Sequence, residues 1–191
     1  MHGKDSDGSD TQERLYKMLE KLQTMARDIP TKYQQRLPYD LLSSLAQVLL
    51  NSTVFEIVRE LAELQHMTEK SLHIQHSKMV NRHKTERETL NKTQREEVLA
   101  AQRQGRRHVL TMLPVLHQKQ QAEMEARQAQ EVTNTHLLIQ QVLDQKVAEQ
   151  QTTMQQVGVP GFHQTQNPKE LKVQMYIMEF VVKIAGIKLP P

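Results

Sequence analysis

The chain has 191 residues, of which 37% are hydrophobic and only 4% aromatic, and it carries a formal net charge of +3. This apolar content is too low for a well-filled globule of that length, yet the apolar residues recur too regularly for a disordered chain. Because there is no cysteine, a disulfide framework and a thiolate zinc site are both excluded.

The N-terminal segment, residues 1–10, is rich in Gly, Ser and Asp, and no apolar run follows it. We therefore expect a disordered tail and no secretory signal. No segment approaches the roughly 18 apolar residues that a membrane span requires. The sequence predicts an intracellular protein without a membrane span.

Three amphipathic helices are predicted within residues 11–72. Asp10 and Glu13 have the spacing of a helix N-cap and its N3 acid, so the first helix should begin there. Its apolar residues recur at steps of three and four until Pro30 ends it. A short second helix should begin near Asp40.

The third helix is predicted to begin at Thr53, which would form a capping box with Glu56. The apolar faces of the three helices predict that they pack together as the N-terminal part of a small helical head. The apolar residues on these faces are Leu15, Met18, Leu22, Met25, Ile29, Leu41, Leu42, Leu45, Val48, Leu49, Val54, Ile57, Val58, Leu61, Leu64 and Met67.

Residues 73–156 are predicted to form a coiled-coil arm, because large apolar residues become sparse there and polar residues fill the helical positions. Gly105 and Pro114 are the helix breakers in this stretch, and they bracket the predicted turn. The two flanking helices, residues 53–104 and 114–156, would be roughly 78 and 65 Å long.

An antiparallel pairing of these helices about a tip near residue 109 would place Gln156 opposite about residue 62. The end of the second helix would then lie beside the predicted head. The alternative is one continuous helix in a parallel dimer, about 150 Å long, and both helix breakers disfavour it.

Residues 157–167 are predicted to be a linker, since Gly158-Val159-Pro160-Gly161 ends a helix. Asn167-Pro168-Lys169-Glu170 then begins another, with Asn as N-cap, Pro in the first turn and Glu at N3. This helix, residues 168–185, has a wide apolar arc that must be covered, and residues 186–191 form a tail. We therefore predict an all-α protein in which both chain ends build a small helical head and a long antiparallel coiled-coil hairpin lies between them.

A basic face is the first alternative to a purely structural arm. Residues 78–107 contain nine Lys or Arg and four Glu. Such a face is able to bind nucleic acid, although pairs at i,i+4 spacing would neutralise it and no aromatic residue is present for base stacking. The candidate phosphate contacts are Lys78, Arg82, Lys84, Arg87, Arg103, Arg106 and Arg107.

Histidines are the second alternative, because His66, His73, His76 and His83 fall on one face of the third predicted helix. His73 and His76 have i,i+3 spacing, which suits a metal, but no carboxylate recurs on that face to complete the ligand shell. A pH-sensitive interface is a further interpretation. We expect an ordinary polar face, with no metal site and no cofactor. No phosphate-binding loop, dinucleotide fingerprint, zincin helix or nucleophile elbow is present, so we expect no enzyme.

Two blocks of sequence resemble the DiGeorge syndrome critical region protein family, which includes an insect gonadal protein. The first block comprises Gln34-Gln35-Arg36-Leu37, Thr53-Val54-Phe55-Glu56-Ile57-Val58 and Gln65-His66-Met67-Thr68-Glu69-Lys70-Ser71-Leu72. The second comprises Asp144-Gln145-Lys146-Val147-Ala148, Val157-Gly158-Val159-Pro160-Gly161-Phe162 and Asn167-Pro168-Lys169-Glu170-Leu171.

The resemblance covers roughly residues 12 to 184 and implies a developmental role in neural crest or gonad, a mainly nuclear location and protein binding. It implies no activity and no cofactor. An adhesion role through laminin-like coiled coils is disfavoured, because this chain lacks the cysteines of such modules.

Together these observations predict a noncatalytic coiled-coil adaptor that binds other proteins through helical contacts and that also has the means to form a homodimer. A nucleic-acid-associated nuclear protein is the alternative. The predicted protein-interface residues are Leu61, Leu64, Met67, Leu90, Ile139, Leu143, Met178 and Phe180.

Overall fold

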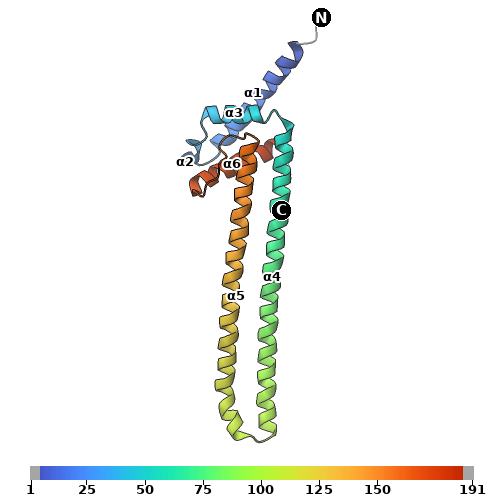
Figure 1. Ribbon diagram of the computed structural model, residues 1–191, viewed down its shortest axis with the longest axis vertical. Helices are drawn as coiled ribbons and strands as arrows, with labels where there is room; N and C mark the ends of the chain where they lie inside the picture. The colour runs from blue at the N-terminus through green and yellow to red at the C-terminus, as the bar shows by residue number, and fades with distance from the viewer. Residues whose placement is uncertain (1–4, 187–191) are drawn as a thin grey trace. The chain divides into compact units, whose positions relative to one another are not determined.

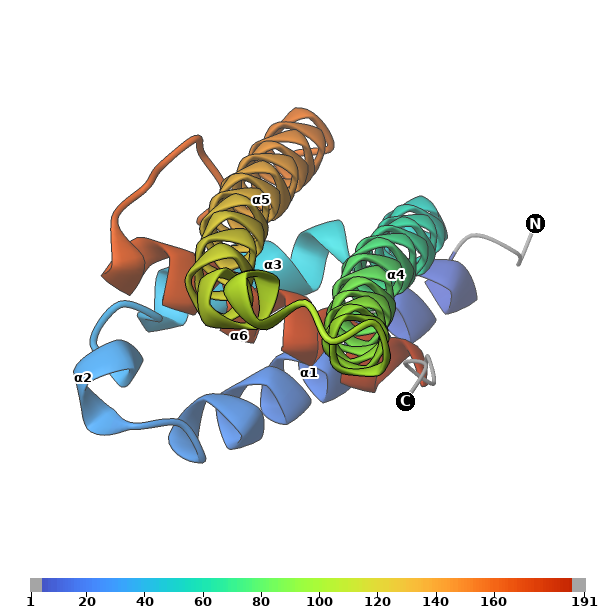
Figure 2. The same cartoon turned by 90° about the horizontal axis from the view of Figure 1, so that it is seen from below.

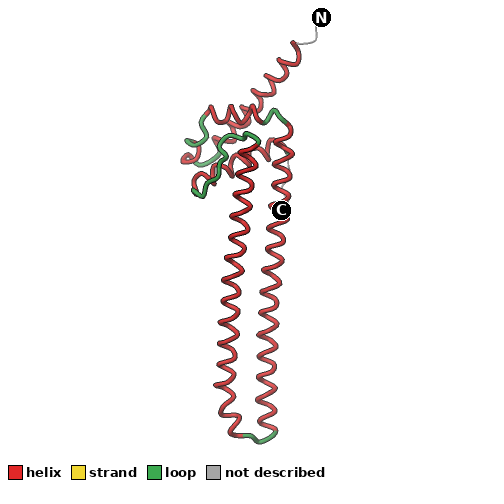
Figure 3. The backbone as a smooth tube through the Cα atoms, viewed as in Figure 1, coloured by secondary structure: helices red, strands yellow, loops and turns green. Residues whose placement is uncertain are grey.

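The computed structural model describes residues 5–186, and all regular structure among them is α-helical (Figure 3). The all-α prediction is confirmed. The helices are α1 (Asp5–Arg27), α2 (Thr31–Gln34), α3 (Tyr39–Val48), α4 (Ser52–Arg103), α5 (Arg107–Gln156) and α6 (Pro168–Ala185) (Figure 1). Among these residues no single helix is long and apolar enough to cross a membrane, and α3 with α4 meets that test only as a pair bent by 94°.

The chain divides into two compact units. One combines residues 1–67 with residues 144–191, and from here on it is called the head. The other is residues 68–143, called the arm. The predicted tail at residues 186–191 lies outside the described residues from 187 onward, as do residues 1–4 of the N-terminal tail.

The head encloses an apolar core to which both chain ends contribute. Helix α1 contacts α2, α3 and α6, and α2 also contacts α6 (Figure 2). The helices meet because each turns its apolar arc inward, as predicted for α1, α3 and α6. The largest fully buried side chains are Phe180, Leu22, Leu45, Leu49, Met154, Ile177, Val58 and Val181.

Two helix starts in the head differ from the prediction. Helix α1 begins at Asp5, so residues 5–10 are helical rather than part of a disordered tail. Helix α4 is capped by Asn51, whose Oδ1 accepts from the Thr53 N–H at 3.0 Å, and not by the predicted Thr53 box. Asparagine is the stronger N-cap of the two.

The segment between α5 and α6 is fixed by two glutamines that are almost fully buried. Gln151 Nε2 donates to the Thr165 carbonyl and to Gln174 Oε1, and its own Oε1 accepts from the Thr165 N–H. Gln174 Nε2 donates to the carbonyls of Gly161 and His163. The predicted start of α6 is confirmed, since Asn167 accepts from the Lys169 N–H and Pro168 is the first helical residue.

In the arm, α4 and α5 run antiparallel and side by side (Figures 1 and 3). Helix α4 ends in a Schellman motif: Gly105 adopts φ +66°, its N–H bonds the Gln102 carbonyl, and the Arg106 N–H bonds the Ala101 carbonyl. The connection between the helices is therefore only residues 104–106. The prediction of an antiparallel hairpin is confirmed, and the alternative of one continuous helix is wrong.

The predicted turn at residues 105–114 is too long, because Pro114 lies inside α5. Residues 107–113 form the first turns of that helix, in which Leu113 is buried and Val109 and Leu110 are half-buried. Burial of apolar side chains stabilises by about 1.5–3 kcal/mol each, which offsets the ~3 kcal/mol cost of a proline. The shorter turn shifts the register: a tip at residue 109 would place His83 opposite residue 135, whereas its partner is Glu131.

Candidate functional site

A shallow groove with a volume of about 430 Å³ lies on the head. Helices α1, α4 and α6 all contribute to its lining. Its lining residues are Arg14, Lys17, Met18, Lys21, Phe55, Arg59, Ile184 and Ala185. Four of these eight residues are basic and none is acidic.

The floor of this groove is apolar because it is the outer edge of the head core. Met18, Phe55 and Ile184 are half-buried and pack against that core. The groove therefore has an apolar floor that is continuous with the packed core of the head.

The rim carries positive charge from two helices. Arg14, Lys17 and Lys21 follow one another along α1 at helical spacing, and Arg59 projects from α4. Only Lys17 has an ion-pair partner among the described residues, Glu13, at 2.6 Å. This exposed contact lowers the pKa of Glu13 and raises that of Lys17. Three uncompensated cations therefore surround an apolar floor.

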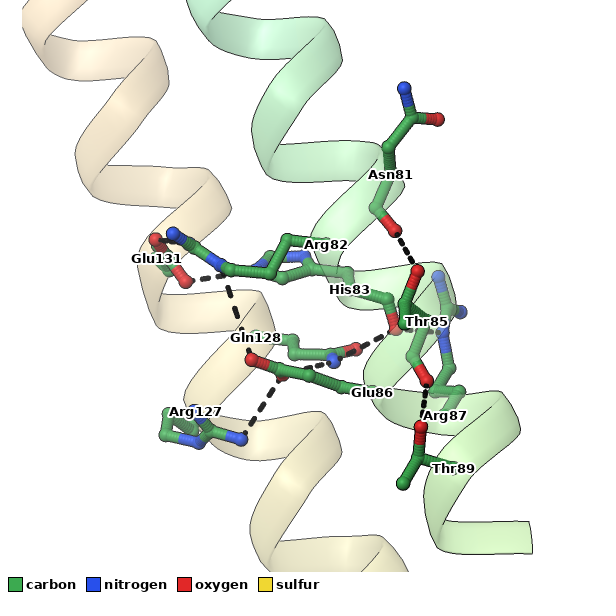
Figure 4. A network of polar contacts seen from close by, with 10 residues as sticks. All are labelled: Asn81, Arg82, His83, Thr85, Glu86, Arg87, Thr89, Arg127, Gln128 and Glu131. Carbon is green, nitrogen blue, oxygen red and sulfur yellow. Dashed lines mark hydrogen bonds and ion pairs between the residues drawn. The ribbon is translucent and has the colours of Figure 1, made fainter. Parts of the chain in front are cut away.

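The arm carries a second distinctive feature, a polar seam between α4 and α5 (Figure 4). His83 is 4% exposed, and its Nε2 lies 2.8 Å from Glu131 Oε2. The carboxylate also accepts from Arg82. One layer further on, buried Gln128 donates to the His83 carbonyl and, at 3.0 Å, to Glu86 Oε2.

These contacts bias the seam carboxylates toward the ionised form. The pKa of Glu131 is lowered because His83 and then Arg82 hydrogen-bond to its carboxylate. The pKa of Glu86 is lowered chiefly by the Gln128 amide, with Arg127 adding favourable charge at 3.2 Å. The seam is therefore an interhelical network of charges and amides in which helices would ordinarily bury leucine.

A second polar layer lies closer to the turn. Gln94 is 6% exposed; it donates to the His117 carbonyl and to Gln120 Oε1, and it accepts from Gln121 at 3.0 Å. His117 Nε2 lies 2.7 Å from Glu97 Oε2. Among the described residues, no buried side-chain nitrogen or oxygen lacks a partner. The polar seam is thus fully hydrogen-bonded, which is the condition under which buried polar groups are tolerated.

The predicted interface residues fall in different environments. Phe180 is 2% exposed in the head core, so it supports folding and presents no surface to a partner. Leu61, Leu90, Ile139 and Met178 are half-buried, whereas Leu64, Met67 and Leu143 are exposed. Five of them belong to the head, and Leu90, Ile139 and Leu143 belong to the arm.

The predicted phosphate contacts are all exposed, but several are already paired. Arg82 contacts Glu131 and Glu86, and Lys84 lies 4.0 Å from Glu88. Arg87 Nε donates a hydrogen bond to the His83 carbonyl at 3.3 Å. Arg103, Arg106 and Arg107 flank the turn and form no ion pair with any described residue.

Sequence reasoning missed the basic groove. The spacing of Arg14, Lys17 and Lys21 is a signal on one helix face, but each residue alone is typical of a solvated surface. Arg59 is distant in sequence, and only the fold brings it to the same groove.

The fold and these surfaces define an all-α protein built around a long helical hairpin. Comparison with known proteins identifies the family and the proteins that its sequence resembles. Residues 1–189 match the family model described as DiGeorge syndrome critical region 6 (DGCR6) protein. The chain is 42% identical over 178 residues to Protein DGCR6 of Gallus gallus, covering 91% of this chain and 84% of that protein. It is 35% identical over 181 residues to Gonadal protein gdl of Drosophila melanogaster, covering 94% and 84% respectively.

The chain therefore belongs to the DGCR6 family, which confirms the resemblance seen in the two sequence blocks. No solved structure matches it.

Proposed function

We propose that this protein is a noncatalytic adaptor, and that the basic groove of its head binds an amphipathic helix carrying acidic residues. The observation that carries the proposal is the groove itself. Its apolar floor of Met18, Phe55 and Ile184 is lined by Arg14, Lys21 and Arg59, which have no ion-pair partner among the described residues. A helix with one apolar and one acidic face complements both features.

The energetics favour this class of ligand. Apolar contact with the floor contributes roughly 25 cal/mol per Å² removed from water. The rim cations contribute association rate and orientation more than affinity, because exposed ion pairs are individually weak. A ligand lacking acidic residues loses orientation, and one lacking an apolar face loses most of its binding free energy.

The remaining parts of the proposal rest on composition and resemblance. A noncatalytic role is supported by the shallow form of the groove on the head and by the polar composition of the arm. A developmental role in gonad or neural crest and a nuclear location come from the family resemblance alone. Imaging of the tagged protein tests the location, and sedimentation velocity tests whether two copies associate.

A designed peptide tests the groove directly. We would label a helical peptide of about 18 residues with fluorescein, placing Leu on one face and Glu on the other. A second peptide would carry Lys in place of every Glu. Fluorescence anisotropy should show that the acidic peptide binds at least about tenfold more tightly than the basic one, and that added salt narrows this difference.

The matched variants locate the binding. Reversal of Arg14, Lys21 and Arg59 to Glu should weaken binding of the acidic peptide by at least about tenfold. Reversal of Lys32, Arg36 and Lys169 changes the net charge of the head equally, but outside the groove, and should have a much smaller effect. Equal losses in the two triple variants, or equal binding of both peptides, would contradict the proposal.

Nucleic-acid binding is the second candidate function, and the turn of the hairpin is the observation that favours it. Arg103, Arg106 and Arg107 lie within five residues and are all exposed. They therefore form a compact cationic cluster with phosphate-binding chemistry. The rest of the basic face is less suited, because Arg82 and Lys84 are engaged by carboxylates.

Salt dependence separates this candidate from the adaptor. Contact with several duplex phosphates predicts a log–log slope of about −0.9 per contact, and reversal of the three turn arginines to Glu should abolish retention. Unchanged mobility of duplex and single-stranded DNA and RNA at low salt would remove this candidate while leaving the groove proposal intact.

A further inference from the structure

Two histidines face each other across the arm, one from each helix. His76 of α4 and His136 of α5 have their Nε2 atoms 3.4 Å apart. Their ring centroids are separated by 5.5 Å and their planes differ by 19°. With near-parallel planes and this centroid distance, the two rings present their Nε2 edges to each other. One tautomer of the pair allows a weak N–H···N contact.

The same arrangement is close to that of two imidazoles sharing one metal ion. Zinc binds imidazole nitrogen at about 2.0–2.1 Å in tetrahedral geometry, so two nitrogens on one ion lie about 3.3 Å apart. The corresponding ring centroids would be about 5.3 Å apart. Both values are within a few tenths of an ångström of those observed, so the ion needs only small side-chain adjustments to enter.

We propose that His76 and His136 bind one divalent transition-metal ion of the zinc class, which joins α4 to α5. Imidazole is the ligand type that zinc, copper and nickel accept readily, whereas magnesium and calcium prefer oxygen. Among the described residues, no group of three or more His, Asp or Glu side chains is placed to hold a metal. The protein therefore supplies two ligands, and water fills the remaining positions.

The position of the pair gives the ion a structural consequence. His76 is half-buried at the interface, and one turn further along α4 the buried Met79 contacts Thr135 of α5. His136 is exposed, so solvent and a metal ion can reach the site. Because both ligands come together only when the hairpin is folded, the bound ion stabilises the antiparallel pairing by mass action.

Sequence spacing pointed to a different pair. His73 and His76 lie three residues apart on one helix, but the structure gives His76 a partner from the opposite helix. His73 is exposed and is the natural control. It has the same chemistry, the same helix and a position one turn away.

Zinc titration of the full chain tests the proposal. Isothermal titration calorimetry should show one Zn²⁺ per chain, and thermal unfolding followed by circular dichroism should shift to higher temperature as Zn²⁺ is added. His76→Ala and His136→Ala should each weaken Zn²⁺ binding by at least about tenfold and remove the thermal shift. His73→Ala should leave both unchanged.

Ligand identity is tested with Cu²⁺ as the probe. Electron paramagnetic resonance should detect two nitrogen ligands in the wild type and in His73→Ala, and one in either site variant. Circular dichroism without metal establishes that each variant folds. Retention of binding in His136→Ala, or its loss in His73→Ala, would overturn the assignment, as would binding that never saturates at one ion per chain.

Discussion

The head and the arm differ in the side chains that fill the space between their helices. In the head, enclosed positions are occupied by residues such as Phe180, Leu22 and Ile177. In the arm, the buried positions between Met79 and Ala101 on α4 are His83 and Gln94, and Gln128 is buried on α5. The head is held together mainly by apolar burial, whereas the arm combines the buried apolar residues Leu72, Met79, Ala101 and Leu113 with a hydrogen-bonded network.

This difference separates stability from specificity. Apolar burial is non-directional, so it gives the head a large driving force. The contacts of the seam are directional: His83 meets Glu131, and Gln94 meets Gln120 and Gln121. A shift of one helical turn would leave those groups unpaired at a cost of about 1–3 kcal/mol each. We infer that the polar seam sets the register of α4 against α5 at the expense of stability in the arm.

Removal of a head core residue should give the largest effect. Phe180→Ala should destabilise the head by about 3–5 kcal/mol, because Phe180 is 2% exposed and its loss leaves a cavity. Hydrogen exchange with mass spectrometry resolves the two units, and peptides from the head should lose protection. Leu138→Ala, at a side chain that is 53% exposed in the arm, is the matched control and should change protection little.

Glycine substitutions compare packing around two left-handed residues. Gly161 has φ +84°, and a Cβ there would lie 2.8 Å from Ile177 Cδ1. Gly161→Ala should therefore combine backbone strain with overpacking and cost about 2–4 kcal/mol. Gly105→Ala meets no atom within 4 Å and should cost only about 1 kcal/mol. Urea unfolding followed by circular dichroism measures both, and equal losses would contradict the contrast.

Buried glutamines offer a subtler comparison. Gln174→Ala should cost about 1–3 kcal/mol, because the carbonyls of Gly161 and His163 and the amide of Gln151 lose their partner inside the head. Gln94→Ala should cost less, since Gln120 and Gln121 are half-buried and water can replace the lost partner. Hydrogen exchange of residues 161–167 and of the seam reports each change separately.

Much of this architecture was predictable because periodicity and helix caps are local. The seams of α1 and α6, the Asn167 cap and the hairpin itself were all predicted. Two predictions were wrong for different reasons. Asn51 displaces Thr53 as a cap because asparagine is the stronger of two local N-caps. Pro114 is accommodated within α5 because burial of neighbouring apolar side chains offsets its cost, and that burial depends on the folded structure.

The candidate sites were less predictable, because their residues come from separate helices. Arg59 joins Arg14 and Lys21 only after α1 and α4 pack. His136 reaches His76 only in the observed register, which differs from that predicted for a tip at residue 109. A shift of a few residues separates such pairs, so long-range side-chain contacts cannot be read from helical spacing.

The smallest expected effect concerns the pH dependence of the arm. Hydrogen bonds from His83 and Arg82 lower the pKa of Glu131 in the folded chain below its ordinary value of 4.5. A carboxyl whose folded pKa is depressed adds stability above about pH 4.5, and this stability is lost as pH falls through the folded pKa. Glu131→Gln should therefore weaken the arm at pH 7 and have little effect near pH 3.

Urea unfolding followed by circular dichroism, repeated at several pH values from 3 to 7, compares the stability of the variant with that of the wild type. Glu88→Gln is the control, because Glu88 is exposed and its contact with Lys84 is 4.0 Å long. The wild type and Glu131→Gln should converge as the carboxylate is protonated, while Glu88→Gln should follow the wild type throughout. A difference in unfolding free energy between wild type and Glu131→Gln that stays constant at every pH would contradict this prediction. It would mean that Glu131 stabilises the arm through the shape and packing of its side chain rather than through its charge, as apolar residues do in the head.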